Sequence, residues 1–139
     1  MDALPGHDYD PMISESTHID RLLSLEHGDV IRQVLDRVGD KWTMLVIANL
    51  KSGALRYSKL HQVIPGISQR MLTLTLRQLN QDGLITRTAY AEVPPRVEYA
   101  LTPLGESFLT TATALVDWAS ANHGAIRENR ARANEPERP

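Results

Sequence analysis

Apolar residues recur at helical spacing through most of the chain, and the pattern changes once to that of a β-hairpin. From residue 17 to 81 they repeat every three or four positions and are interrupted by Gly, Pro or a capping residue. The interruptions predict helices over residues 17–25, 30–38, 42–50, 59–64 and 69–81. The side chains expected to cap the last four are those of Asp29, Asp40, Ser58 and Ser68. Residues 54–56 are expected to form a short extended link.

Two strand-like runs follow, over residues 84–90 and 96–101, and they predict a β-hairpin. Pro94 and Pro95 must lie at its tip, because proline has no N–H to donate to a neighbouring strand. Thr102 and Pro103 then resemble an N-cap followed by proline at the first helical position, which opens a final helix reaching about Asn122. The predicted fold is mainly α-helical with one small β-hairpin.

The helices at 59–64 and 69–81, joined by a glycine-containing turn, are typical of a helix-turn-helix. On a helical wheel, one side of the second helix carries Leu72, Leu76 and Leu79, with Thr75 near them, and must face the core. The other side carries Arg70, Thr73, Leu74, Arg77 and Gln81. Arginine can bind guanine and glutamine can bind adenine in the major groove, and Thr73 and Leu74 could contact a thymine methyl group. The alternative is an ordinary amphipathic surface helix.

The hairpin that follows at once favours the DNA-binding interpretation, because a helix-turn-helix with a two-stranded ribbon is a winged helix. Arg96, beside the tip, could reach the DNA backbone or the minor groove, and Arg87 could meet a phosphate. Alternatively, Arg96 is an exposed hairpin charge paired with Glu92 or Glu98. Three residues at predicted helix N-termini are further candidates for phosphate contacts: Ser58, Lys59 and Ser68.

The charge distribution agrees with a localised surface for a polyanion. The 139 residues carry a net charge of -2, but residues 1–31 hold a net charge of -6, residues 32–99 of +5 and residues 100–139 of -1. The alternative is that these charges only lie on solvent-exposed helix faces and bind no partner. The length fits one domain, which we place at residues 17–122, between a flexible acidic arm (1–16) and a flexible tail (123–139).

Several classes of chemistry are excluded by the composition. The chain has no cysteine, and its five histidines are dispersed without metal-ligand spacing. No catalytic constellation or phosphate-binding loop is recognisable, so neither an enzyme nor a cofactor or metal site is expected. Apolar runs are too short to span a membrane and no leader segment is recognisable, so a soluble, cytoplasmic protein is expected.

The final helix has an apolar side broader than a small domain needs for its own core. This side predicts a two-fold dimer contact, to which the early helix contributes. The residues expected in this contact are Phe108, Leu115 and Trp118, together with Ile19, Leu22 and Leu23. The alternative is that the final helix packs only on its own domain. Trp42, among aliphatic neighbours, is expected to anchor the core.

From about Asp29 to Trp118 the sequence resembles the HxlR-type winged helix-turn-helix transcriptional regulators of bacteria. The segments that carry the resemblance are Gly39–Thr43, Arg56–Leu60, Pro65–Thr73, Leu79–Ile85 and Tyr90–Gly105. The resemblance implies a homodimer on a near-palindromic operator. It also implies that a recognition helix over residues 69–81 and a wing over residues 87–98 contact double-stranded DNA, through Gln69, Arg70, Thr73, Arg77 and Arg96.

The sequence departs from the family pattern in two respects. Many relatives sense oxidants with a cysteine at the position that aligns with Asp29, so thiol sensing is excluded here. Relatives also usually have polar residues in place of Leu74 and Thr75. We therefore predict a DNA-binding regulator, with repression as the expected mode although activation fits the same residues. The alternative is a winged helix that serves only as a protein-interaction module. The sequence is also compatible with a small-molecule effector.

Overall fold

The computed structural model describes residues 11–136, with side chains from residue 18 onward. The chain divides into two compact units between Asp40 and Lys41. The buried hydrophobic core lies between Val46 and Ile85, inside the second unit. The division between the units falls before Val46, the first residue of this core.

The first unit is a pair of helices, α1 (Pro11–Ser24) and α2 (Gly28–Gly39). A Cβ atom at Gly28 would lie 2.1 Å from the carbonyl oxygen of Leu23, so the close approach of the helices requires glycine. Arg32 donates a hydrogen bond from Nη1 to the same oxygen at 2.7 Å. This bond satisfies one carbonyl at the end of α1, where no helical partner exists.

The start of α1 corrects the prediction of a helix from Thr17 and of an arm over residues 1–16. The helix begins at Pro11, because proline suits the first turn, where its missing N–H would have no helical partner. Residues 1–10 of the predicted arm lie outside the described residues.

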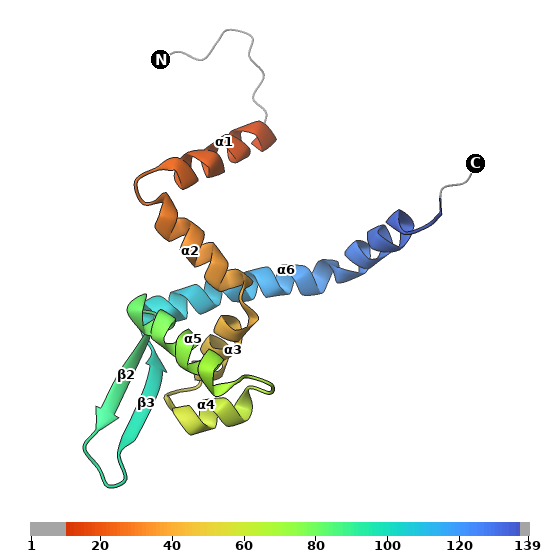
Figure 1. The fold of residues 1–139 in the computed structure, drawn as a ribbon. Coiled ribbons are helices and arrows are strands. Elements are labelled where there is room, and N and C mark those ends of the chain that lie inside the picture. The colour runs from red at the N-terminus through yellow and green to blue at the C-terminus, as the bar shows by residue number, and fades with distance from the viewer. Residues whose placement is uncertain (1–10, 137–139) are drawn as a thin grey trace. The chain divides into compact units, whose positions relative to one another are not determined.

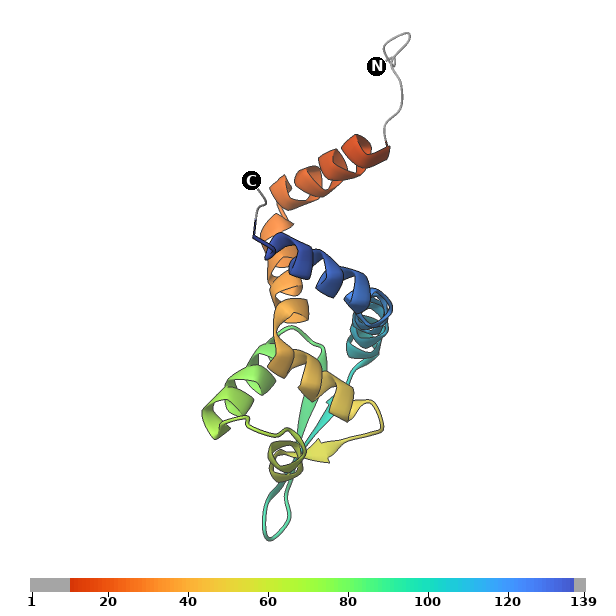
Figure 2. The same cartoon turned by 90° about the vertical axis from the view of Figure 1, so that its right-hand side faces the viewer.

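The second unit contains the remaining elements. These are α3 (Lys41–Leu50), β1 (Leu55–Arg56), α4 (Tyr57–Val63), α5 (Gln69–Gln81), β2 (Ile85–Tyr90), β3 (Arg96–Leu101) and α6 (Pro103–Ala133). The core joins α3, α4, α5 and the start of β2, and Trp42 packs against it as predicted. Both views show the β2–β3 hairpin projecting past α4 (Figure 1, Figure 2).

The sheet has three antiparallel strands in the order β1-β3-β2. The hairpin register runs from Ile85 opposite Leu101 to Tyr90 opposite Arg96, which confirms both predicted strands and leaves the two prolines at the tip. The segment predicted as an extended link supplies β1, with Leu55 opposite Tyr99. A two-residue strand has no alternation of its own, and only its pairing with β3 identifies it.

Side-chain caps start α5 and α6, the helices on either side of the hairpin, as predicted. Ser68 accepts a hydrogen bond from the backbone N–H of Met71 at 3.0 Å and starts α5. Gly83, at φ 75°, ends it in the left-handed region that favours glycine. Thr102 accepts from the N–H of Gly105 at 3.0 Å and donates to the carbonyl of Gly83 at 2.6 Å. These bonds tie the start of α6 to the end of α5.

Two predicted caps are wrong, because Asp29 and Ser58 lie inside their helices. His27 is the N-cap residue of α2 and Arg56 that of α4, and neither makes a side-chain cap bond. Pairing of β1 with β3 places the start of α4 directly after Arg56. Asp29 lies instead in the first turn of α2, where a carboxylate interacts favourably with the positive end of the helix.

Helix α6 is longer than predicted. It continues to Ala133 rather than ending near Asn122, so residues 123–133 of the expected flexible tail are helical. Arginine, glutamate and alanine dominate this stretch and are good helix formers, and they outweigh the single glycine, Gly124. Among the described residues, no helix is both long and apolar enough to cross a membrane.

Candidate nucleic-acid interface

Helix α5 has the two faces that its sequence predicts. Its buried side chains are Leu72, Thr75, Leu76 and Leu79. The residues predicted to point outward are all exposed: Arg70, Thr73, Leu74, Arg77 and Gln81. Gln69, in the first turn, is exposed as well. The buried face fixes α5 on the core, and the opposite face is open to a partner.

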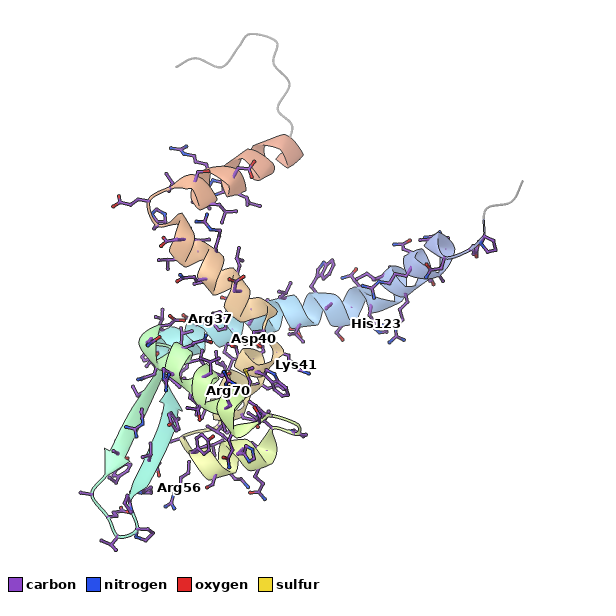
Figure 3. All side chains as sticks on the ribbon, viewed as in Figure 1. Arg37, Asp40, Lys41, Arg56, Arg70 and His123 are labelled. Carbon is purple, nitrogen blue, oxygen red and sulfur yellow. The ribbon has the colours of Figure 1, made fainter. Side chains whose placement is uncertain are left out.

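Arg70 and Arg77 are exposed on that open face, and Figure 3 shows the position of Arg70 on α5. Among the described residues, neither guanidinium takes part in an ion pair or a side-chain hydrogen bond. A hydrated, unpaired guanidinium keeps all of its N–H donors available for a phosphate or for a guanine edge.

Tyr57, the first residue of α4, is a site residue that the sequence did not reveal. Its hydroxyl donates to the backbone carbonyl of Gln69 at 3.0 Å and lies 3.1 Å from the hydroxyl oxygen of Thr73. The ring packs against the core, and the hydroxyl reaches the first turns of α5. No spacing rule indicates a contact across 12 and 16 residues, and a tyrosine at a helix start is no signal by itself.

Two hollows that share the lining residues Tyr57, Thr73 and Arg77 lie along α5, and together they are called the groove here. One hollow, of about 430 Å³, is lined by Tyr57, Gln69, Arg70, Thr73, Leu74 and Arg77. The other, of about 300 Å³, is lined by Tyr57, Thr73, Leu76, Arg77, Asn80, Arg87 and Tyr99. The groove therefore brings Arg87 of β2 beside Arg77 of α5, a neighbourhood that the sequence did not predict. Asn80 and Tyr99 are further lining residues that it missed.

On the wing, Arg96 is in the paired arrangement that the sequence left open as an alternative. Its Nη1 lies 2.9 Å from Glu98 Oε1 and its Nη2 lies 2.8 Å from Glu92 Oε1. The guanidinium also stacks on the ring of Tyr90, 4.0 Å from the centroid. Only 24% of the side chain is exposed. Arg87, on the other strand, is exposed.

The remaining candidates for phosphate contacts lie at two helix starts. Ser58 and Lys59 are exposed in the first turn of α4. Ser68, also exposed, already uses its oxygen to cap α5. The first turn of each helix leaves backbone N–H groups without helical partners, and these favour an anion.

A family model described as HxlR-like helix-turn-helix matches residues 37–127. The chain belongs to the HxlR-like helix-turn-helix family. This is a family of DNA-binding transcriptional regulators, not of enzymes. The match covers the whole of α3 to α5, the hairpin and most of α6.

Named relatives agree with this assignment. An HTH-type transcriptional regulator of Methanothermobacter thermautotrophicus is 46% identical over 99 residues, which cover 71% of this chain and 75% of that protein. The regulator YtfH of Escherichia coli is 44% identical over 103 residues, or 72% of this chain and 82% of that protein.

Solved structures show the same winged-helix fold. The transcriptional regulator YtfH from Salmonella typhimurium has a TM-score of 0.63 at 40% identity, and the match covers 72% of this chain and 89% of that one. The redox regulator HypR in its reduced form has a TM-score of 0.64 at 34% identity, covering 70% and 97%.

The apolar residues predicted for a dimer contact differ in exposure in this HxlR-like chain. In α6, Leu115 is 53% and Trp118 is 57% exposed. Phe108 is half-buried and packs against the core of its own unit, so it matches the alternative reading of that helix. In α1, Ile19 is exposed at 55%, whereas Leu22 and Leu23 are half-buried.

Proposed function

We propose that this HxlR-like chain is a cytoplasmic, homodimeric transcriptional repressor that binds a near-palindromic operator with α5 in the major groove. The observation that carries the proposal is the open face of α5, where Arg70 and Arg77 are exposed and unpaired among the described residues. Arginine in a major groove binds guanine O6 and N7 with two hydrogen bonds, the commonest specific contact to a base. Gln69, Thr73 and Leu74 are the other residues of α5 that we expect to contact base edges.

Phosphate contacts position α5 on the duplex. Arg87 lines the same groove as Arg77, and Ser58, Lys59 and Ser68 lie exposed at helix starts. Contacts of this kind orient a protein without reading sequence. Arg96 is the exception, because it must release a glutamate before it can bind a phosphate.

A two-fold dimer is supported by apolar side chains that water cannot solvate favourably. Ile19 on α1 and Leu115 and Trp118 on α6 are more than half exposed. A two-fold axis would set two copies of α5 about 34 Å apart, the spacing of successive major grooves on one side of B-DNA. Repression needs only occupancy of promoter DNA, which is why we prefer it to activation.

The test compares the wild type with Arg70→Ala/Arg77→Ala in a mobility-shift titration on DNA from upstream of its own gene. Each lost bidentate contact removes about 1–3 kcal/mol, so the double variant binds at least about 30-fold more weakly. The matched control is Arg127→Ala/Arg130→Ala on the exposed last turns of α6, which removes the same charge and leaves binding within about threefold.

Two results would refute DNA recognition by α5. One is a wild type that retards no DNA at moderate salt, which would favour the protein-interaction module. The other is a double variant that binds as tightly as the wild type while circular dichroism shows that both are folded. Oligomeric state is measured separately by analytical ultracentrifugation, where a monomer would contradict the dimer.

A further inference from the structure

We propose that Tyr57 determines which bases α5 accepts, because its hydroxyl dictates where the hydrogen of the Thr73 hydroxyl points. Tyr57 is a positioning residue in this role and acts through Thr73. The inference rests on the proposed function and adds a specificity determinant to it.

The direction of both hydrogen bonds follows from the atoms present. The oxygen of Tyr57 lies 3.0 Å from the carbonyl oxygen of Gln69 and 3.1 Å from the hydroxyl oxygen of Thr73. A carbonyl only accepts, and a phenol has one hydrogen, so Tyr57 must donate to Gln69. The contact with Thr73 is then satisfied only if Thr73 donates to Tyr57. One arrangement of hydrogens serves both contacts.

The consequence is that Thr73 has no hydrogen to offer a base. The residue is exposed on α5 and lines both hollows of the groove, between the positions of Arg70 and Arg77. Its oxygen keeps both lone pairs, and the side chain keeps its methyl group. The lone pairs can accept from the amino group of adenine or cytosine, and the methyl group can contact the methyl group of thymine. Guanine presents only acceptors in the major groove, so Thr73 is expected to reject guanine at the position it faces.

The competing interpretation is that Tyr57 only holds α4 against α5. Its ring packs on the core, and Tyr57→Phe keeps that ring while removing the hydroxyl. A purely structural tyrosine would change stability or overall affinity equally for all DNA sequences. A residue that orients the Thr73 hydroxyl would change the preference for one base in each half-site.

The experiment measures affinity for operators that carry each of the four bases at every position, for wild type, Tyr57→Phe, Thr73→Val and the double variant. The wild type is expected to disfavour guanine by about tenfold at one position per half-site. Tyr57→Phe frees the Thr73 hydrogen to donate to guanine, so this discrimination falls to about twofold. Preferences elsewhere and the dependence of affinity on salt stay unchanged, because no charge is lost.

Thr73→Val supplies the second, independent measurement. It removes the hydroxyl and keeps methyl groups, so the preference for adenine or cytosine disappears and that for thymine remains. Adding Tyr57→Phe to Thr73→Val is then expected to change no base preference further. If Tyr57→Phe does not fold, Thr73→Val still puts the inference at risk, since wild-type preferences in that variant would overturn it.

The outcomes separate this inference from the proposed function. A wild type that selects bases, together with a Tyr57→Phe that selects the same bases equally well, overturns the role of Tyr57 and leaves DNA recognition intact. A wild type that binds all sequences alike, or none, overturns both.

Discussion

Helix α5 and the β2–β3 wing both carry arginines that the sequence directs at DNA, but the two regions hold them differently. Arg70 and Arg77 on α5 are exposed without ion-pair partners among the described residues. Arg96 on the wing is bound by two glutamates and stacked on Tyr90. The residue type is the same, and only the neighbours differ.

The difference shows that arginine content alone does not define a DNA-binding surface. A guanidinium on α5 exchanges water for DNA, whereas Arg96 would first have to give up charge-assisted hydrogen bonds to carboxylates. The cluster of Arg96 with Glu92 and Glu98 carries a net negative charge and is not attractive to a phosphate as a whole. We therefore expect α5 to supply most of the affinity and Arg96 to hold the shape of the wing tip.

The largest expected effect comes from removing a buried side chain that packs α5 on the core. Leu72 is fully buried in the core, so Leu72→Ala should lower the free energy of unfolding by about 2–5 kcal/mol, through lost burial and the cavity left behind. Urea denaturation measures this loss. Leu74→Ala, at a site 41% exposed on the opposite face, should change stability by less than about 0.5 kcal/mol. Equal losses in the two variants would contradict the assignment of the faces.

A smaller effect is expected at the start of the same helix. Ser68→Ala removes the hydrogen bond to the N–H of Met71 and should cost about 1 kcal/mol of stability in the absence of DNA. Ser68→Asn retains a side-chain acceptor and is the matched control, with an expected loss of a few tenths of a kcal/mol. A Ser68→Ala variant as stable as the wild type would show that the cap is not needed.

The smallest effect is expected in the salt dependence of DNA binding, when either of two arginines in the wing is replaced. Arg87→Gln removes an exposed charge, so the slope of log affinity against log salt should fall by about 0.9, the value for one lost phosphate contact. Between 50 and 200 mM salt this amounts to roughly a threefold change. Arg96→Gln should change the slope by less than about 0.3, because its charge is already balanced by glutamates.

Salt titrations of DNA binding for the two variants measure both slopes. If Arg96→Gln lowers the slope of log affinity against log salt as much as Arg87→Gln does, Arg96 leaves its glutamates to bind a phosphate. The wing would then resemble α5, and the contrast between the two regions would be lost.

Local signals predicted α5 and the hairpin well. The cap at Ser68, the glycine at residue 83 and the two prolines at the wing tip act on neighbours a few residues away. The errors arose where neighbours distant in sequence decide. β1 exists only through its pairing with β3, and that pairing also places the start of α4 before Ser58. The end of α6 is a separate, local case: the helix continues to Ala133, past its predicted end, because the arginine and alanine residues of its last turns favour a helix.

The candidate site was predicted in part, for the same reason. Helical periodicity predicted which residues of α5 face outward, and all of them are exposed. It could not predict that Tyr57 reaches two residues of α5, or that Arg87 lines a groove with Arg77. These contacts join separate elements, and no pattern within one element contains them.

The amino-acid order alone thus determined a helix with one apolar and one basic face, followed by a proline-tipped ribbon, since periodicity and caps depend on neighbours along the chain. Only the tertiary structure decided which charges remain free and which hydroxyl hydrogens are engaged. Arg96 is held because the hairpin register places Tyr90 opposite it and both glutamates within reach. Thr73 is oriented because α4 packs against α5 with Tyr57 at their contact. Ion pairs and hydrogen bonds require atoms within about 3 Å of each other, and across elements only folding brings them that close.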